Sequence, residues 1–394
     1  MAEKLQVLIL NNISAHGLKR LPGERFDHGK EISKPDAILV RSADMHSMDI
    51  PKSVLAIGRA GSGTNNIPVK AMSARGVPVF NAPGANANAV KELVVAGMLL
   101  AARNIGGAMK FVSALDPKDA EMEKKVEGGK KTYAGFELAG HTLGVIGLGK
   151  IGCLVADVAI KLGMHVIGYD PEITVDAAWS LPSQVKKANS LADVLKNSNF
   201  VSMHVPLVDA TRKMINAAAL EQMKAGSVLL NFSREGVVDE AAVLAALEAK
   251  KLANYVCDFP SAHVNGHPHV VALPHLGAST REAEENCAQM VAVQVRDYLL
   301  DGNIVNSVNF PTVTMPRESG FRIAIANANV PNMVGQISTA MAEAKLNISN
   351  MMNKSKGDVA YTLVDVDSKV PKKVIDAIAK IEGVLAVRYL PMEG

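Results

Sequence analysis

The chain has 394 residues, of which 48% are hydrophobic, 21% are charged and only 4% are aromatic. This composition is typical of a globular α/β protein and excludes a disordered, collagen-like or disulfide-rich chain. Forty-two lysines and arginines against 39 aspartates and glutamates leave a formal net charge of +3, without a long run of one sign. The sequence therefore has no electrostatic signature of a nucleic-acid or membrane-surface partner. At about 100–200 residues per domain, the length predicts two to four domains.

The three cysteines, Cys153, Cys257 and Cys287, are odd in number and far apart, which indicates reduced thiols. The longest apolar run, residues 93–102, is too short to span a bilayer, which takes about 20 residues. No signal peptide is expected, because no long apolar segment follows the N-terminus. These features predict a cytoplasmic protein.

The first third of the chain predicts short buried strands joined by polar connections. The strands are expected at residues 5–10, 37–41, 55–58 and 77–80. Continuous apolar runs of this length are typical of parallel strands covered by helices on both faces. A long helix is expected over residues 89–104, and the charged stretch 116–132 is expected to face solvent.

From residue 142 strands and helices alternate, which predicts a doubly wound parallel sheet. Strands are expected at residues 143–146, 164–169, 200–205, 228–232, 255–257 and 270–273, and helices at 150–162, 190–197, 216–222 and 240–249. One more helix is expected between residues 280 and 300. The tail, 321–394, has the order strand, helix, strand, strand, helix, strand, which is the ferredoxin-like βαββαβ pattern.

A G-x-G-x-x-G motif over residues 147–152 lies between a predicted strand and a predicted helix. Gly147 permits a tight turn, Gly149 lets the backbone approach a pyrophosphate, and Gly152 lets the helix pack on the strand. The N–H groups of Lys150 and Ile151, at the helix start, would face the phosphates.

Asp170 ends the next predicted strand and would accept hydrogen bonds from the adenosine ribose hydroxyls. A carboxylate there repels a 2′-phosphate, so the preferred cofactor is NAD rather than NADP. The alternative is an ordinary glycine-rich turn. The complete sequence of strand, turn, helix, strand and acid disfavours that interpretation.

Several motifs resemble one enzyme family. They are IGRAGSG at 57–63, NAPGAN at 81–86, the glycine motif, HVPL at 204–207, NFSR at 231–234 and PHLGAST at 274–280. Over nearly the whole chain the sequence resembles the D-isomer-specific 2-hydroxyacid dehydrogenase family, in particular members with a C-terminal ACT domain. The resemblance implies an α/β fold with two Rossmann-like lobes, each a doubly wound parallel sheet, plus a ferredoxin-like ACT domain.

The same resemblance implies a division of the chain. The expected parts are a catalytic lobe at 1–94 and 280–311, an NAD-binding Rossmann lobe at 95–279, a linker at 312–320 and an ACT regulatory domain at 321–394. The family would place the active site in the cleft between the two lobes.

Two residues are the main catalytic candidates. Reduction of a 2-oxo acid needs a cation for the substrate carboxylate and carbonyl, and an acid for the developing alkoxide. Arg234 offers a planar bidentate fork, and His275 is the residue type that titrates near neutral pH. The resemblance assigns them these roles, with His275 acting as the base in oxidation. The alternatives are a surface arginine at a strand end and a structural histidine.

Two departures from the family pattern stand out. Glu235 follows the arginine where the family has glycine, and the glutamate expected five residues after Asp258 is replaced by His263. Asp258 would hold the nicotinamide carboxamide, and it is the nearest acid in sequence that could orient His275. Lys91 is the fallback proton donor or a partner of the substrate anion, or alternatively a solvated residue at a helix start.

The resemblance adds further binding residues. The cofactor site would also include His204, Val205, Pro206, Ser233, Asp258 and Ala278. Arg41 and Arg59 could bind a substrate phosphate, backbone N–H groups around Ser62 and Gly63 could hold a carboxylate, and Asn86 would face the nicotinamide; the alternative for the two arginines is surface residues.

The tail carries a candidate effector site. Asn327, Asn329 and Asn347 lie where ACT domains of serine-sensitive relatives bind L-serine between two subunits, and the alternative is a purely structural oligomerisation domain. His263, His267 and His269, with Cys257, fit no structural zinc spacing. They are interpreted as loop histidines, and no metal site is expected.

The resemblance implies NAD-dependent oxidation of 3-phospho-D-glycerate to 3-phosphohydroxypyruvate, the first step of L-serine biosynthesis. Alternatives are reduction of glyoxylate, hydroxypyruvate or 2-oxoglutarate, or an NAD(H)-sensing protein built on a dehydrogenase fold. A homo-oligomer, dimer or tetramer, is expected through the nucleotide lobes.

Overall fold

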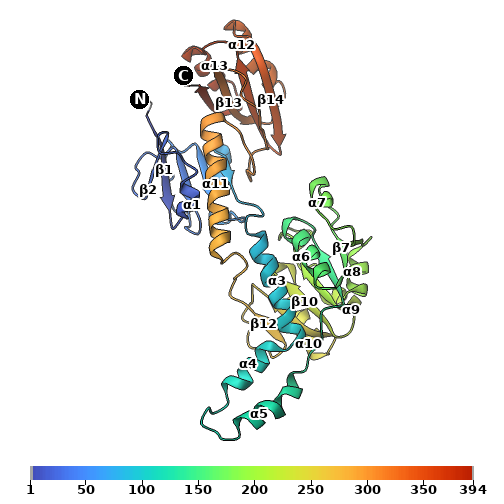
Figure 1. The fold of residues 1–394 in the computed structure, drawn as a ribbon. Coiled ribbons are helices and arrows are strands. Elements are labelled where there is room, and N and C mark those ends of the chain that lie inside the picture. The colour runs from blue at the N-terminus through green and yellow to red at the C-terminus, as the bar shows by residue number, and fades with distance from the viewer. Residues whose placement is uncertain (1–2, 393–394) are drawn as a thin grey trace. The chain divides into compact units, whose positions relative to one another are not determined.

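The computed structural model describes residues 3–392, which form two compact units (Figure 1). The first unit combines residues up to 85 with residues from 284 onward, and the second covers 86–283. Each unit contains a parallel sheet, and the first also carries an antiparallel sheet from the end of the chain. The α/β class with two doubly wound parallel sheets and a small C-terminal sheet is confirmed.

The parallel sheet of the first unit has the order β2-β1-β3-β4-β5. Its strands are β1 (Leu5–Leu10), β2 (Phe26–Gly29), β3 (Ala37–Val40), β4 (Ala56–Arg59) and β5 (Val79–Phe80), and its helices are α1 (Ala15–Leu18), α2 (Val69–Ala74) and α11 (Arg281–Asp301). α11 packs directly on the sheet, because a Cβ added to Gly58 would lie 2.5 Å from a methyl of Val291. Glycine on β4 therefore permits this close approach of helix and strand.

The second unit contains a seven-stranded parallel sheet of order β12-β11-β10-β9-β6-β7-β8. Its strands are β6 (Thr142–Ile146), β7 (His165–Tyr169), β8 (Lys186–Lys187), β9 (Phe200–Met203), β10 (Ser227–Asn231), β11 (Leu252–Cys257) and β12 (Val270–Ala272). Its helices include α3 (Ala87–Ala102), α6 (Lys150–Lys161), α7 (Val175–Trp179), α8 (Leu191–Asn197), α9 (Ala217–Gln222) and α10 (Glu240–Glu248), with the short 3-10 turn η2 (Glu235–Val237).

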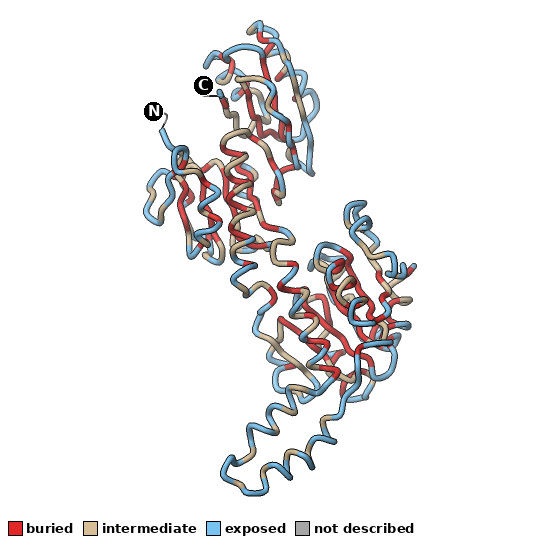
Figure 2. The backbone as a smooth tube through the Cα atoms, in the orientation of Figure 1, coloured by how far each residue is buried: buried red, intermediate tan, exposed pale blue. Residues whose placement is uncertain are grey.

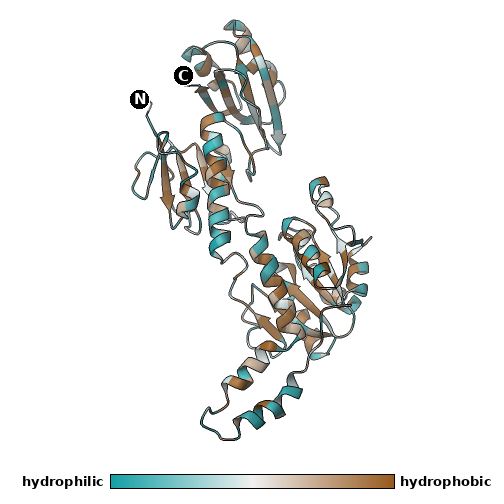
Figure 3. Cartoon of the chain, in the orientation of Figure 1, coloured by the Kyte–Doolittle hydropathy of each residue, from teal (hydrophilic) through white to brown (hydrophobic). Residues whose placement is uncertain are grey.

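Two separate apolar clusters hold helices to the two faces of this sheet. One cluster contains Val94 of α3 and Val155 of α6, and the other contains Leu195 of α8 and Val243 of α10. Strands such as β9 and β10 are buried along their whole length, which fits their largely apolar sequences. In Figure 3 the strand that Figure 1 labels β10 is largely brown, the hydrophobic end of the scale.

The region after α3 differs from the sequence prediction. The long helix ends at Ala102, and α4 (Ile105–Ser113), α5 (Met122–Gly129) and the 3-10 turn η1 (Lys130–Tyr133) follow. Asn104, the last residue of the expected helix, has a left-handed backbone (φ 52°), which separates α3 from α4. The charged stretch is exposed as expected, but much of it is helical, with an ion pair between Lys124 and Glu121 three residues apart. Neither α4 nor α5 contains a buried residue (Figure 2).

The C-terminal domain confirms the ferredoxin-like prediction. Its strands β13 (Phe321–Ala328), β14 (Ile348–Lys356), β15 (Val359–Val366) and β16 (Val384–Pro391) form an antiparallel sheet of order β14-β15-β13-β16, with helices α12 (Met333–Glu343) and α13 (Lys372–Ala379). One face of the sheet packs on these helices through residues such as Ile325 and Ile337. The other face, including Tyr361 and Leu363, belongs to the apolar core that contains α11.

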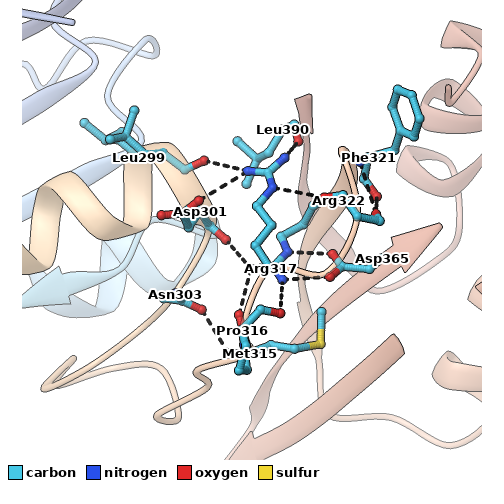
Figure 4. Close-up of polar contacts among 12 residues, drawn as sticks. Leu299, Asp301, Asn303, Met315, Pro316, Arg317, Phe321, Arg322, Asp365 and Leu390 are labelled. Carbon is cyan, nitrogen blue, oxygen red and sulfur yellow. Dashed lines mark hydrogen bonds and ion pairs between the residues drawn. The ribbon is translucent and has the colours of Figure 1, made fainter. Parts of the chain in front are cut away.

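A fully buried ion pair joins this domain to the end of α11 (Figure 4). Arg322 and Asp365 face each other on β13 and β15 and form two hydrogen bonds, of 2.6 and 2.8 Å. The remaining three N–H groups of the guanidinium donate to the carbonyls of Asp301, Met315 and Pro316. All five donors of this buried cation are therefore satisfied, as an arginine removed from water requires.

Two more arginines bind the C-terminal turn of α11. Arg388 of β16 donates to the carbonyls of Tyr298 and Leu299, and Arg317 donates to that of Leu300. The last carbonyls of a helix lack partners within it and carry partial negative charge. The C-terminal domain and the segment that leads into it thus supply cations to the helix end that attracts them.

Within residues 3–392 no single helix is long and apolar enough to cross a membrane. Among the described residues, α3 and α4 taken together have the length and composition of a membrane span, but the two helices are bent by 68° relative to each other.

Candidate active site

The glycine motif forms a tight turn between β6 and α6. Gly147 has a positive φ of 88°, and a Cβ added to Gly152 would lie 2.0 Å from the carbonyl oxygen of Gly147. Both positions therefore require glycine. Gly149, which precedes the first residue of α6, is exposed, and a Cβ added there would meet no atom within 4 Å. This open backbone beside a helix N-terminus fits the pyrophosphate of a dinucleotide, with Lys150 and Ile151 in the first helical turn.

Asp170 lies beside this turn at the end of β7. One carboxylate oxygen accepts the N–H of Leu148 at 2.8 Å, and the other accepts the N–H of Glu172 at 2.9 Å. A carboxylate has about four lone-pair sites, so two bonds to the backbone leave capacity for ribose hydroxyls. Asp170 therefore shapes the glycine turn and keeps acceptor capacity for a ribose.

Ser233 joins the ends of β9 and β10. Its hydroxyl donates to the carbonyl of Met203 at 2.5 Å and accepts the N–H of Val205 at 3.2 Å. This arrangement fixes the backbone of the His204-Val205-Pro206 segment. Ser233 thus positions the expected cofactor loop through its backbone.

His204 is a neutral imidazole. Burial lowers its pKa from 6.5 to about 3, because a buried site disfavours the charged form. Its Nε2 lies 2.9 Å from the hydroxyl of Ser202, and among residues 3–392 its buried Nδ1 has no hydrogen-bond partner.

Arg234 follows β10 and is exposed. Asn231 donates to its backbone carbonyl at 2.9 Å, which fixes the start of the segment. Among the described residues, its guanidinium meets one hydrogen-bond acceptor, the carbonyl of Ser233 at 2.7 Å, and lies over the ring of Phe259, with Cζ 5.4 Å from the ring centroid. Glu235, which replaces the family's glycine, begins the turn η2.

His275 lies in a strained loop after β12. Its φ of 55° is unusual for a non-glycine residue. Asp258, at the end of β11, holds the loop: its carbonyl accepts the N–H of His275 at 3.0 Å, and its carboxylate accepts those of Leu276 at 2.7 Å and Gly277 at 2.8 Å. Burial raises the pKa of Asp258, while these N–H groups and the charge of His275 oppose that shift.

The expected contact between Asp258 and His275 thus runs through the backbone. Within residues 3–392 no hydrogen bond joins the Asp258 carboxylate to the imidazole. Instead, the ring of Phe259 lies against it, with centroids 4.4 Å apart and planes at 51°. Phe259 was not among the site residues predicted from the sequence, although it lies between Asp258 and Pro260, just after a predicted strand.

The N-terminal turn of α3 approaches this loop. A Cβ added to Gly277 would lie 3.4 Å from a methyl of Val90. Lys91, the next residue on α3, donates to the side chain of Asn88 at 2.6 Å and lies 3.9 Å from Glu92. The lysine is therefore held by neighbours on its own helix. Asn86 is half-buried and precedes the first residue of α3, and Ala278 of the loop is also half-buried.

The candidate phosphate residues belong to the first unit. Arg41 forms an ion pair with Glu284 at 2.7 Å, and Arg59 donates from Nε to the backbone carbonyl of Arg41 at 3.0 Å. The two arginines are therefore neighbours, as predicted, but a carboxylate already faces one of them. Ser62 is exposed and Gly63 is half-buried in the loop after β4.

The three asparagines of the candidate effector site do not gather within one chain. Asn327 is buried and donates to the carbonyl of Ala328, and Asn329 donates to that of Gly357 at the hairpin between β14 and β15. Asn347 instead bonds Asp367, at the opposite end of β15.

The loop histidines form no metal-binding group. His267 and His269 have ring centroids 6.0 Å apart, and the described part of the chain contains no cluster of three or more histidine, cysteine or acidic side chains placed to hold a metal ion. Burial raises the pKa of Cys257 to about 12, so its thiol is protonated at neutral pH.

Comparisons with known proteins find relatives over most of the chain. Residues 96–277 match the family described as D-isomer specific 2-hydroxyacid dehydrogenase, NAD binding domain. The D-3-phosphoglycerate dehydrogenase of Haemophilus influenzae is 33% identical over 86% of this chain and 81% of its own length. D-3-phosphoglycerate dehydrogenase 2 of Saccharomyces cerevisiae is 28% identical over 96% and 85%. The NAD⁺-bound 3-phosphoglycerate dehydrogenase of Entamoeba histolytica has a similar fold, with a TM-score of 0.60 and 23% identity over 78% of this chain and 99% of that one.

Proposed function

The chain belongs to the D-isomer-specific 2-hydroxyacid dehydrogenase family, whose enzymes use NAD, and we propose that it oxidises 3-phospho-D-glycerate to 3-phosphohydroxypyruvate. The observation that carries the proposal is the similarity to D-3-phosphoglycerate dehydrogenases over most of both chains. The open glycine turn beside Asp170, and a histidine and an arginine that both contact the ring of Phe259, support the chemistry.

In the proposed reaction, Arg234 holds the substrate carboxylate and the 2-hydroxyl with its guanidinium, which can form a bidentate pair with an α-hydroxy acid. His275 takes the hydroxyl proton as the C2–H bond breaks and the hydride leaves with both bonding electrons, so that a carbon–oxygen double bond forms. NAD, when bound, accepts that hydride. Gly149 and the start of α6 would hold its pyrophosphate, and Asp170 its adenosine ribose.

The phosphate of the substrate is assigned to Arg41 and Arg59. The proximity of the two arginines supports this assignment. The ion pair between Arg41 and Glu284 reduces the positive charge that Arg41 offers to a phosphate. Arg59→Ala is expected to raise KM for the phosphorylated substrate while changing that for glyoxylate little. An equal rise for both would exclude phosphate binding by Arg59.

A single assay tests the proposed substrate. Consumption of NADH is measured with phosphohydroxypyruvate, glyoxylate and 2-oxoglutarate, and kcat/KM is expected to be largest for phosphohydroxypyruvate. A preference for either of the other acids would assign the chain to another 2-hydroxyacid dehydrogenase. No turnover with any acid, together with tight NADH binding, would favour the sensor alternative.

The wider proposal is a cytoplasmic homo-oligomer. The helices α4 and α5 contain no buried residue, and Met109 on α4 is 64% exposed, which suits a contact between nucleotide lobes. L-serine is the proposed effector, with Asn329 of one subunit and Asn347 of another at opposite ends of the C-terminal sheet. Unchanged activity and thermal stability in millimolar L-serine would favour a structural role for this domain.

A further inference from the structure

One side chain in the second unit contacts both residues assigned to catalysis. Phe259 has its ring 4.4 Å from the imidazole of His275, centroid to centroid, and the guanidinium carbon of Arg234 lies 5.4 Å from the same ring centroid. The three residues follow three neighbouring strands, β10, β11 and β12. A single half-buried phenyl ring therefore contacts both functional side chains.

The surroundings of His275 leave its side chain without a polar support. No glutamate occurs between Glu248 and Glu282, and in residues 3–392 no hydrogen bond or ion pair to the imidazole is formed. Asp258 fixes the backbone at the left-handed residue and at the two residues that follow it. These bonds determine where the Cα of His275 lies but leave its side-chain torsions open.

Phe259 supplies the missing restraint. An aromatic face attracts a guanidinium and packs against planar rings, so contact with it restrains the orientations of both side chains. Asp258 holds the loop backbone, Arg234 lies over the ring of Phe259, and Lys91 of α3 is held by Asn88. None of them offers a direct hydrogen bond to the imidazole in the described structure.

We propose that Phe259 is a positioning residue of the dehydrogenase, which orients His275 and Arg234 through contact with its ring and takes over the orienting part of the absent glutamate. The proposal rests on the roles proposed above for these two residues. It predicts that removing the ring slows the chemical step and leaves cofactor binding intact, because Phe259 contacts neither the glycine turn nor Asp170 in this structure.

The test compares two leucine variants. Phe259→Leu removes the ring beside His275, and Phe136→Leu removes a similar ring that lies 5.0 Å from the imidazole of His141 in the same unit. Phe259→Leu is expected to lower kcat about 10- to 100-fold, as misplaced reacting groups do. Its KM for NAD and its unfolding midpoint should stay close to those of the unaltered protein. Phe259→Tyr should restore most of the lost kcat, and Phe136→Leu should leave kcat unchanged.

A deuterium isotope effect on kcat, measured with 3-phosphoglycerate deuterated at C2, separates positioning from mere stability. It should rise in Phe259→Leu as hydride transfer becomes rate-limiting. A kcat within twofold of the unaltered protein, or a loss equal to that in Phe136→Leu, would overturn the proposal. His275→Ala separates the proposed role of His275 from that of Phe259. If His275→Ala leaves kcat unchanged, the proposed function of His275 is wrong. If His275→Ala is inactive while Phe259→Leu is fully active, only the role of Phe259 is refuted.

Discussion

Two arginines show how differently this molecule uses the same side chain. Arg322, at the junction of the C-terminal domain and α11, is fully buried and all five of its N–H groups have acceptors. Arg234, at the carboxyl edge of the seven-stranded sheet, is exposed and meets one carbonyl and one ring among residues 3–392. A guanidinium with every donor engaged can only hold structure. One with most donors unengaged is available to a carboxylate.

The same contrast extends to the acids beside them. Asp365 is buried against a cation, whereas the carboxylate of Asp258 accepts the N–H groups of the loop that carries His275. The junction is therefore a site where buried charges cancel. At the sheet edge, the side chains of His204, Arg234 and His275 leave hydrogen-bonding groups without partners among residues 3–392, which is typical of a ligand-binding surface.

The largest effect is expected at the sheet edge. His275→Ala should lower kcat by about 10²–10⁴-fold, the usual contribution of a general acid–base group. Steady-state oxidation of 3-phosphoglycerate measures it, with His263→Ala as the control because that histidine is exposed in a nearby loop. If His275→Ala is nearly silent while Lys91→Ala abolishes turnover, the lysine carries the proton.

A substitution at the junction of the C-terminal domain and α11 should change the free energy of unfolding rather than kcat. Asp365→Ala leaves Arg322 charged and buried without its carboxylate, which costs about 3–5 kcal/mol of the free energy of unfolding. Denaturant titration measures this loss. Asp376→Ala removes an exposed i,i+4 pair with Lys372 and should cost about 0.5 kcal/mol at most. Equal losses in the two variants would show that burial of the pair is unimportant.

Acid should lower the free energy of unfolding, because His204 in the second unit is buried as a neutral imidazole. Its pKa is about 3 in the folded chain against an ordinary 6.5, so below pH 6.5 the unfolded chain binds a proton that the folded chain does not. The free energy of unfolding therefore falls as pH falls from 6.5 toward 3, by about 1.4 kcal/mol per unit, or about 2 kcal/mol between pH 6.5 and 5. His204→Gln should lose this part of the slope, and His28→Gln, on the exposed side of β2, should keep it. Parallel slopes in all three proteins would contradict the buried neutral imidazole.

The smallest effect concerns cofactor choice. The unaltered protein should use NAD far better than NADP, because Asp170 would repel a 2′-phosphate. Asp170→Ala should lower the ratio of kcat/KM with NAD to kcat/KM with NADP by about tenfold, equivalent to about 1.4 kcal/mol. Part of any general loss will come from the bond to Leu148, so the ratio, not the rate, is the measurement. Equal use of both cofactors by the unaltered protein would refute the assignment.

The sequence by itself determined the features that depend on neighbours along the chain. Apolar runs predicted the parallel strands, the glycine spacing predicted the turn at 147–152, and the alternation in the tail predicted the βαββαβ order. Each reflects local geometry, since a turn or a buried strand imposes its requirements on consecutive residues. Arg234 and His275 were also proposed from sequence, because short motifs and a family resemblance carry them.

Only the tertiary structure decided the pairings between distant residues. Arg322 and Asp365 are 43 positions apart, and nothing in their local sequence marks them as partners. Asp258 was expected to orient the imidazole, yet its carboxylate bonds the loop backbone, and Phe259 contacts the ring instead. These outcomes depend on which strands lie side by side and on how the loops leave them. A side chain's partner is set by that three-dimensional neighbourhood, which no pattern of consecutive residues encodes.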